Sequence, residues 1–217
     1  MKSSRLEAFS DGILAIIITV MVLEMKVPTQ ATFHALGEVY PIFISYILSF
    51  LYVGIYWNNH HHLFQATTFV NGKVLWANLH LLFWLSLIPF ASGWVGRTNF
   101  SAIPQALYGL ILLMSAVAFT ILQRLILKIH GKESVLYAAI GKDYKGKISL
   151  IFYAIAVPLS FINTWISFFI YFGVTLLWIV PDKRIEQALY KEIKENYKAN
   201  KKDNKEIENL IKDLEEN

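Results

Sequence analysis

Long apolar runs separated by short polar segments fill the first 180 residues of the chain. A helix rises about 1.5 Å per residue, so about 20 apolar residues cross the roughly 30 Å of hydrocarbon in a bilayer. Four runs have about this length, and a fifth is divided by Pro158 and the Asn163-Thr164 pair into a helical hairpin. The runs are residues 6–25, 39–57, 74–95, 103–127 and 148–180. The pattern therefore predicts an all-α membrane protein with six transmembrane helices in residues 1–180.

From Pro181 onward acidic and basic residues are nearly balanced in number, and no apolar run is long enough to span a membrane. Two short apolar stripes at helical spacing predict amphipathic helices. Their members are Ile185, Leu189 and Ile193, then Ile207, Leu210, Ile211 and Leu214. A solvated, partly disordered segment is equally compatible with this composition. We expect residues 181–217 to form a charged cytoplasmic tail.

Composition narrows the class of protein. Hydrophobic residues make up 55% of the chain, more than one soluble core of this size needs, so membrane lipids are the expected surroundings. The absence of cysteine excludes disulfides and thiolate chemistry. The polar tail mixes both signs of charge, which argues against nucleic acid as a partner.

The basic residues gather on one side of the six-helix arrangement. That side carries the tail and Lys2, Arg5, Lys73, Arg124, Lys128, Lys132, Lys142, Lys145 and Lys147, whereas the other side carries only Lys26 and Arg97. Positive residues stay on the cytoplasmic side of membrane proteins. We therefore expect a multi-pass protein of the cell membrane with both termini in the cytoplasm.

Two short segments have the composition of ligand sites but not the spacing. GKDYKGKI (residues 141–148) follows a phosphate-binding loop for seven positions, but Ile148 replaces the magnesium-binding hydroxyl and no strand precedes it. Lysines facing anionic headgroups explain it better.

His60, His61 and His62 would point about 100° apart on a helix, so they cannot share a metal ion. We predict no metal site, and one imidazole turned inward as a hydrogen-bond partner.

The first apolar run carries one continuous stripe. At 100° per residue the stripe contains Arg5, Phe9, Gly12, Ile16, Thr19 or Val20, and Leu23. Periodicity alone favours a face that contacts lipid or a core over a face that lines a pore. Ser10 and Asp11 lie to the side of the stripe. A carboxylate this close to hydrocarbon is costly unless it is paired, so we expect Asp11 to face protein, with Arg5 and His60 as candidate donors.

The residues around this carboxylate resemble a known family. Arg5, Phe9, Ser10, Asp11 and Gly12 form the string R-x-x-x-F-S-D-G, which resembles the signature of the transmembrane protein 175 family of potassium channels. Similarity to the family's second and third helices continues in Trp57-Asn58-Asn59-His60, Leu63-Phe64-Gln65, Asn78 and Pro89. The match covers about the first ninety residues. A single set of six spans resembles the prokaryotic members, which assemble as tetramers.

This resemblance implies a homotetramer whose central pore is lined by the first helix of each subunit, without a TVGYG filter. Ile16 would form the narrowest ring, Val20 and Leu23 further apolar rings, and Thr19 a hydroxyl ring that favours potassium. Ala15 departs from members that carry serine there. A ring of isoleucines that expels water can act as both gate and size filter. The implied function is a potassium-selective cation channel with no enzymatic activity and no cofactor beside the permeant ion.

The remaining residues of the signature would form a polar network that holds the pore helix in register. Its members would be Arg5, Phe9, Ser10, Asp11, Trp57, His60 and Asn78. Two alternatives stay open. A secondary transporter would show inverted repeats with broken helices. We expect Pro41, Pro89, Pro104 and Pro158 to interrupt spans, but no repeat pairs them. A membrane-embedded enzyme or scaffold would use the histidines.

Overall fold

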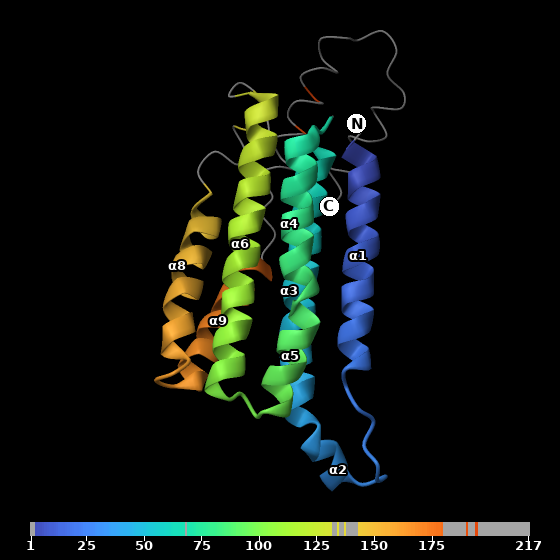
Figure 1. Ribbon diagram of the computed structural model, residues 1–217, viewed down its shortest axis with the longest axis vertical. Coiled ribbons are helices and arrows are strands. Elements are labelled where there is room, and N and C mark those ends of the chain that lie inside the picture. The colour runs from blue at the N-terminus through green and yellow to red at the C-terminus, as the bar shows by residue number, and fades with distance from the viewer. Residues whose placement is uncertain are drawn as a thin grey trace.

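The computed structural model describes residues 3–67, 69–131, 134, 137, 143–179, 190 and 194. These ranges form helices packed side by side and hold no β-strand (Figure 1). The helices are α1 (Ser3–Leu23), α2 (Phe33–Glu38), α3 (Tyr40–Gln65), α4 (Gly72–Ser86), α5 (Ile88–Arg97), α6 (Ala102–His130), α8 (Tyr144–Leu159) and α9 (Thr164–Ile179). The predicted all-α fold is confirmed.

Four segments are long and apolar enough to cross a membrane: α1, α3, α4 continued by α5, and α6. They match the first four predicted spans. The predicted hairpin appears as α8 and α9, and Ser160 to Asn163 join the two helices. Each has 16 residues, which corresponds to about 24 Å of helix and is shorter than the hydrocarbon core. The tail predicted from residue 181 lies outside the described residues, apart from Tyr190 and Lys194.

Prolines begin helices here more often than they interrupt them. Pro41 stands in the first turn of α3, and Pro89 in the first turn of α5, where a missing N–H costs little. Pro104 also falls in the first turn of α6. Only Pro158 lies inside a described helix, close to the end of α8. The expectation that all four prolines interrupt spans was therefore wrong for Pro41 and Pro104.

Tyrosines fill the core between α3, α6, α8 and α9. The Tyr52 hydroxyl donates to the backbone oxygen of Tyr171 over 2.7 Å and lies 3.3 Å from the hydroxyl of Tyr153. Ser49 and Tyr108 join their hydroxyls over 3.0 Å. These four tyrosines are buried, and each hydroxyl has a partner as a low-dielectric interior requires. The network fixes α8 and α9 against the rest of the bundle.

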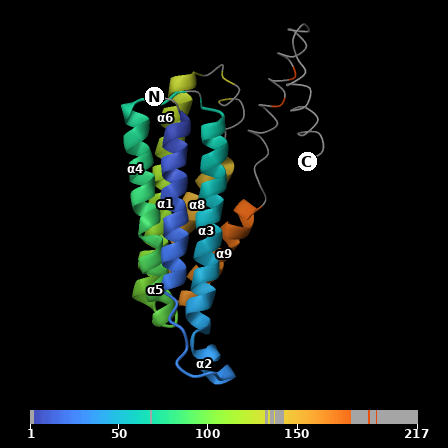
Figure 2. The same ribbon diagram turned by 90° about the vertical axis from the view of Figure 1, so that its right-hand side faces the viewer.

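The first helix lies at one edge of this bundle. α1 packs against α3, α4 and α5. Figure 2 shows α1 in front of α3 and α4, with nothing over its outer face. Figure 1 places α8 and α9 at the opposite edge. A single subunit therefore leaves one side of α1 uncovered.

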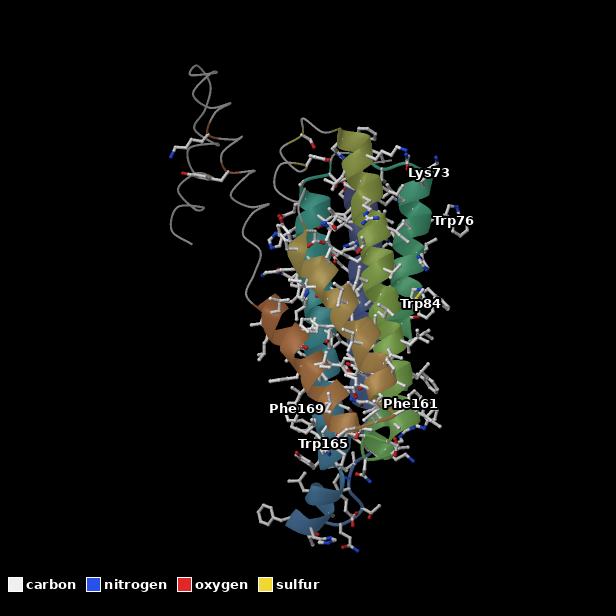
Figure 3. The ribbon with its side chains drawn as sticks, turned by 90° about the vertical axis from the view of Figure 1, so that its left-hand side faces the viewer. Lys73, Trp76, Trp84, Phe161, Trp165 and Phe169 are labelled. Atoms are coloured by element: carbon white, nitrogen blue, oxygen red, sulfur yellow. The ribbon has the colours of Figure 1, made fainter. Side chains whose placement is uncertain are left out.

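Large aromatic side chains project outward near both ends of the bundle. Figure 3 shows Trp76 close to Lys73 at one end, and Phe161, Trp165 and Phe169 near the other. All four aromatic residues are more than half exposed. Amphipathic and aromatic rings collect at the two membrane interfaces. This distribution agrees with a bundle that crosses a bilayer along its length.

Candidate pore helix and its polar contacts

The two long faces of α1 differ in burial. One face is buried against the subunit and consists of Leu6, Ser10, Leu14, Ile17 and Met21. The other carries the stripe defined from the sequence, and its large side chains are exposed: Phe9 by 51%, Ile16 by 63%, Val20 by 40% and Leu23 by 75%. Such a contiguous apolar surface on one helix marks a face that meets lipid or another chain. The described helices of the subunit do not use these large side chains for packing.

Thr19 lies on the exposed face among these apolar residues. Its hydroxyl donates to the backbone oxygen of Ala15 over 2.9 Å. This internal bond uses the hydroxyl proton, so both lone pairs of the threonine oxygen remain free for an outside partner. Thr19 therefore presents an acceptor, the kind of group that contacts a cation.

A buried chain of hydrogen bonds ties α1 to α4 and α3. Asn78 donates from Nδ2 to the Ser10 hydroxyl over 2.9 Å, and Ser10 donates in turn to the Leu6 backbone oxygen over 2.9 Å. Asn78 Oδ1 lies 2.8 Å from His60 Nε2, which must donate because an amide oxygen only accepts. His60 Nδ1 is buried without a partner. The prediction that one histidine turns inward is confirmed for His60.

A second set of contacts joins α1 to α3. The indole of Trp57 donates to Asp11 Oδ1 over 3.1 Å. One turn further, His61 Nδ1 lies 2.7 Å from Glu7 Oε1. The two helices are antiparallel, so four residues back along α1 correspond to four residues forward along α3. The rings of Trp57 and His61 stack with centroids 6.0 Å apart, which makes the two contacts one continuous unit.

This arrangement confirms that Asp11 finds a donor, but corrects which residue supplies it. Its donor is Trp57, whereas Arg5 and His60 were the candidates. Arg5 is exposed and makes no hydrogen bond or ion pair with any residue that the structure describes. Asp11 faces protein as expected, since it is half-buried and lines a groove between α1, α3 and α9. The structure thus brings together Ser10, Asn78 and His60, and separately Asp11 and Trp57, while Arg5 and Phe9 stay outside both groups.

The other end of α1 is held by an ion pair that the sequence reasoning missed. Arg97, the last residue of α5, contacts the carboxylate of Glu24 just after α1 ends. Both side chains are about half exposed. The pair places a positive charge at the C-terminus of α5, where the helix dipole favours it. Polar contacts therefore fix α1 at both of its ends.

The three consecutive histidines do not converge. His60 contacts Asn78 on α4, His61 contacts Glu7 on α1, and His62 only approaches the His61 ring, with centroids 5.7 Å apart. Across the described ranges, no group of three or more histidine, aspartate or glutamate side chains is placed to hold a metal ion. The histidines act as separate contacts between helices.

Comparison with known proteins agrees with the position and signature of α1. The family described as "Endosomal/lysosomal potassium channel TMEM175" matches residues 5–89. A potassium channel of Chryseobacterium sp. (strain P1-3) is 54% identical over 189 residues, which are 87% of this chain and 98% of that channel. The chain belongs to the TMEM175 family.

Further TMEM175 relatives extend the similarity beyond the signature. A potassium channel of Chamaesiphon minutus is 31% identical over 184 residues, covering 76% of this chain and 88% of that protein. The crystal structure of a lysosomal potassium-selective channel TMEM175 homolog from the same organism matches with a TM-score of 0.73 and 25% identity, over 83% of this chain and 97% of that chain. The family and these relatives are channels and not enzymes, so the enzyme alternative is dropped.

Proposed function

We propose that this TMEM175 protein assembles as a homotetrameric, potassium-selective channel in the cell membrane, with a pore lined by the four α1 helices. One observation carries the proposal: the stripe of Ile16, Val20 and Leu23 is the face that the subunit leaves uncovered, while α3, α4 and α5 cover the rest of α1. The potassium-channel names of the relatives give the ion. The end of the bundle that carries the N-terminus and most of the basic side chains would lie in the cytoplasm.

The proposed constriction follows from side-chain chemistry. A single helix cannot enclose a pore, so the stripe needs symmetric copies around a shared axis, and closed cyclic symmetry is the usual arrangement. Four Ile16 side chains at that axis would form an apolar ring that dewets and resists ion passage. Val20 and Leu23 would add rings one and two turns further along. Thr19, with its free lone pairs, would offer the ion an oxygen contact.

The polar contacts of α1 would set the rotation of this stripe. Ser10 and Asn78 hold one side of the helix and Asp11 and Trp57 hold another, so the helix cannot turn about its axis without losing bonds. Replacing the partners of α1 would therefore disturb assembly before it altered ion preference. These polar residues would therefore hold the pore helix in place and would not contact the ion.

Potassium flux into liposomes reconstituted with the full chain tests the proposal. We expect Ile16→Ala to raise potassium flux at least severalfold, because the narrowest apolar ring is lost. Ile166→Ala is the matched control: Ile166 is also exposed, by 44% against 63% for Ile16, but lies on α9 at the opposite edge of the bundle. Equal flux through wild type and Ile16→Ala would contradict the constriction.

Assembly is tested separately by the mass of the purified particle. Light scattering of the detergent-solubilised protein, corrected for bound detergent, is expected to give four chains per particle. A monomeric particle with full flux would contradict the shared pore. Flux that requires a co-transported substrate would favour the transporter alternative.

A further inference from the structure

A small cavity opens between α6 and α8 near the end of the bundle at which α1 begins, away from the proposed pore. It has a volume of about 160 Å³. Its lining includes Gln123, Arg124 and Leu127 from α6, with Asp143, Lys147 and Leu150 from the start of α8. The channel function assigns no role to these residues.

The two basic residues of the cavity form no ion pair with an acidic residue in the part of the chain that the structure describes. Arg124 is exposed and makes no hydrogen bond or ion pair with any described residue. Among the described residues, Lys147 contacts the ring of Tyr144, with Nζ 5.9 Å from its centroid, and forms no ion pair. Asp143 lines the same cavity, but its Oδ1 accepts from the Gly146 backbone N–H over 2.9 Å as the N-cap of α8. Two positive charges and one capped carboxylate leave a net positive site.

Gln123 provides an independent indication of a ligand. Its side chain is 9% exposed, yet it forms no hydrogen bond within the described part of the chain. Buried polar side chains almost always have a partner. Because Gln123 lines the cavity, a group bound there would supply the missing acceptor for its amide N–H. That acceptor would lie beside the two cations.

The surroundings of the cavity indicate a lipid. Ile121 and Ile148 are exposed on the same two helices by 40% and 41%, and Ile151 continues this apolar surface along α8 by 59%. Leu127 and Leu150 form the apolar part of the lining. A ligand here would meet cations at the membrane interface and an apolar surface below them, which suits an amphiphile better than a soluble ion.

We propose that this cavity binds the phosphate of an anionic phospholipid headgroup. Arg124 and Lys147 attract the negative charge, and Gln123 donates its amide N–H to a phosphate oxygen. The acyl chains follow the exposed isoleucines of α6 and α8. The site depends on the protein being embedded in a membrane but not on which ion it conducts.

Native mass spectrometry of the full chain, titrated with phosphatidylglycerol or phosphatidylcholine, tests this site. We expect the wild type to retain phosphatidylglycerol preferentially. A basic residue near an anionic surface contributes about fivefold in affinity, so Arg124→Gln and Lys147→Gln should each weaken retention about fivefold. Both side chains are exposed, so the substitutions should not affect folding. The matched control is Lys73→Gln. Lys73 lies at the same end of the bundle, but on α4 and outside the cavity lining (Figure 3).

The outcomes separate the lipid from other sources of the same chemistry. Retention of phosphatidylglycerol that falls in Arg124→Gln and Lys147→Gln but not in Lys73→Gln supports the proposal. Equal loss in all three variants, or no preference over phosphatidylcholine in the wild type, overturns it. Displacement of the lipid by millimolar inorganic phosphate also overturns it, because the site would then bind free phosphate without using the apolar surface.

Discussion

Replacing Asn78 by alanine tests how much the buried network holds α1 in place. Asn78 is fully buried and bonds two helices, since it accepts from His60 and donates to Ser10. Its loss leaves His60 without any hydrogen bond in the described structure, because Nδ1 already has none. A bond between helices inside a membrane contributes about 0.6 kcal/mol on average, whereas an orphaned buried group costs about 1–3 kcal/mol. Two lost bonds and one orphaned imidazole therefore predict a destabilisation of about 2–4 kcal/mol.

Reversible unfolding of the full chain by SDS in mixed micelles measures this loss. Asn59→Ala is the matched control, because Asn59 donates only to the backbone oxygen of Ile55 within its own helix. The control should change the free energy of unfolding by less than Asn78→Ala does. A double-mutant cycle with Ser10→Ala should also give a coupling of about 0.5 kcal/mol or more. Equal destabilisation by Asn78→Ala and Asn59→Ala would refute the reasoning.

Two further substitutions probe packing and surface charge, both measured by thermal melting of the purified protein. Gly109→Ala should lower the free energy of unfolding by about 1–3 kcal/mol, because the added Cβ would overlap the Tyr171 hydroxyl. Gly173→Ala is the control and should cost clearly less, because the space around Gly173 is open. Equal melting temperatures of the two variants would contradict the close approach of Gly109 and Tyr171. Arg97→Gln should cost less than about 1 kcal/mol, because its pair with Glu24 is half exposed; a larger loss would show that the pair is shielded in the assembled particle.

Hydropathy predicted the positions of the four helical segments that are long enough to span a membrane, but not the full length of every helix. The fifth and sixth predicted spans appear as helices α8 and α9, which are shorter than a full span. The second apolar run ends at residue 57, whereas α3 continues to Gln65. The last residues of α3 are polar, and His60 and His61 among them contact other helices. A hydropathy pattern detects only helix that lies in hydrocarbon, so it did not detect this continuation. The short helix α2 was missed for a related reason. It has six residues and begins at the N-cap of Thr32, a signal too brief for periodicity to detect.

The side-chain partners of α1 were only partly predictable. The resemblance to the family named Ser10, Asp11, His60 and Asn78, but not which of them would meet. Glu7 and His61 were missed, although their spacing contained a signal: each lies four residues from a member of the Asp11 and Trp57 pair. In an antiparallel pair of helices that spacing places the next contact one turn further along. This spacing predicts a contact only if the rotation of α1 relative to α3 is known, and tertiary packing sets that rotation.

The distribution of polar contacts along α1 has a consequence for the proposed pore. Side-chain hydrogen bonds and ion pairs from α1 to other described helices occur at its first part, through Glu7, Ser10 and Asp11, and just after its end, through Glu24. Between them the helix packs only through apolar side chains. Apolar packing is not directional, so it restrains position more than rotation. The contacts at the two ends therefore set the angle of the stripe in the middle. Substitutions at these contacts, five to nine residues away from Ile16, are expected to rotate the proposed constriction.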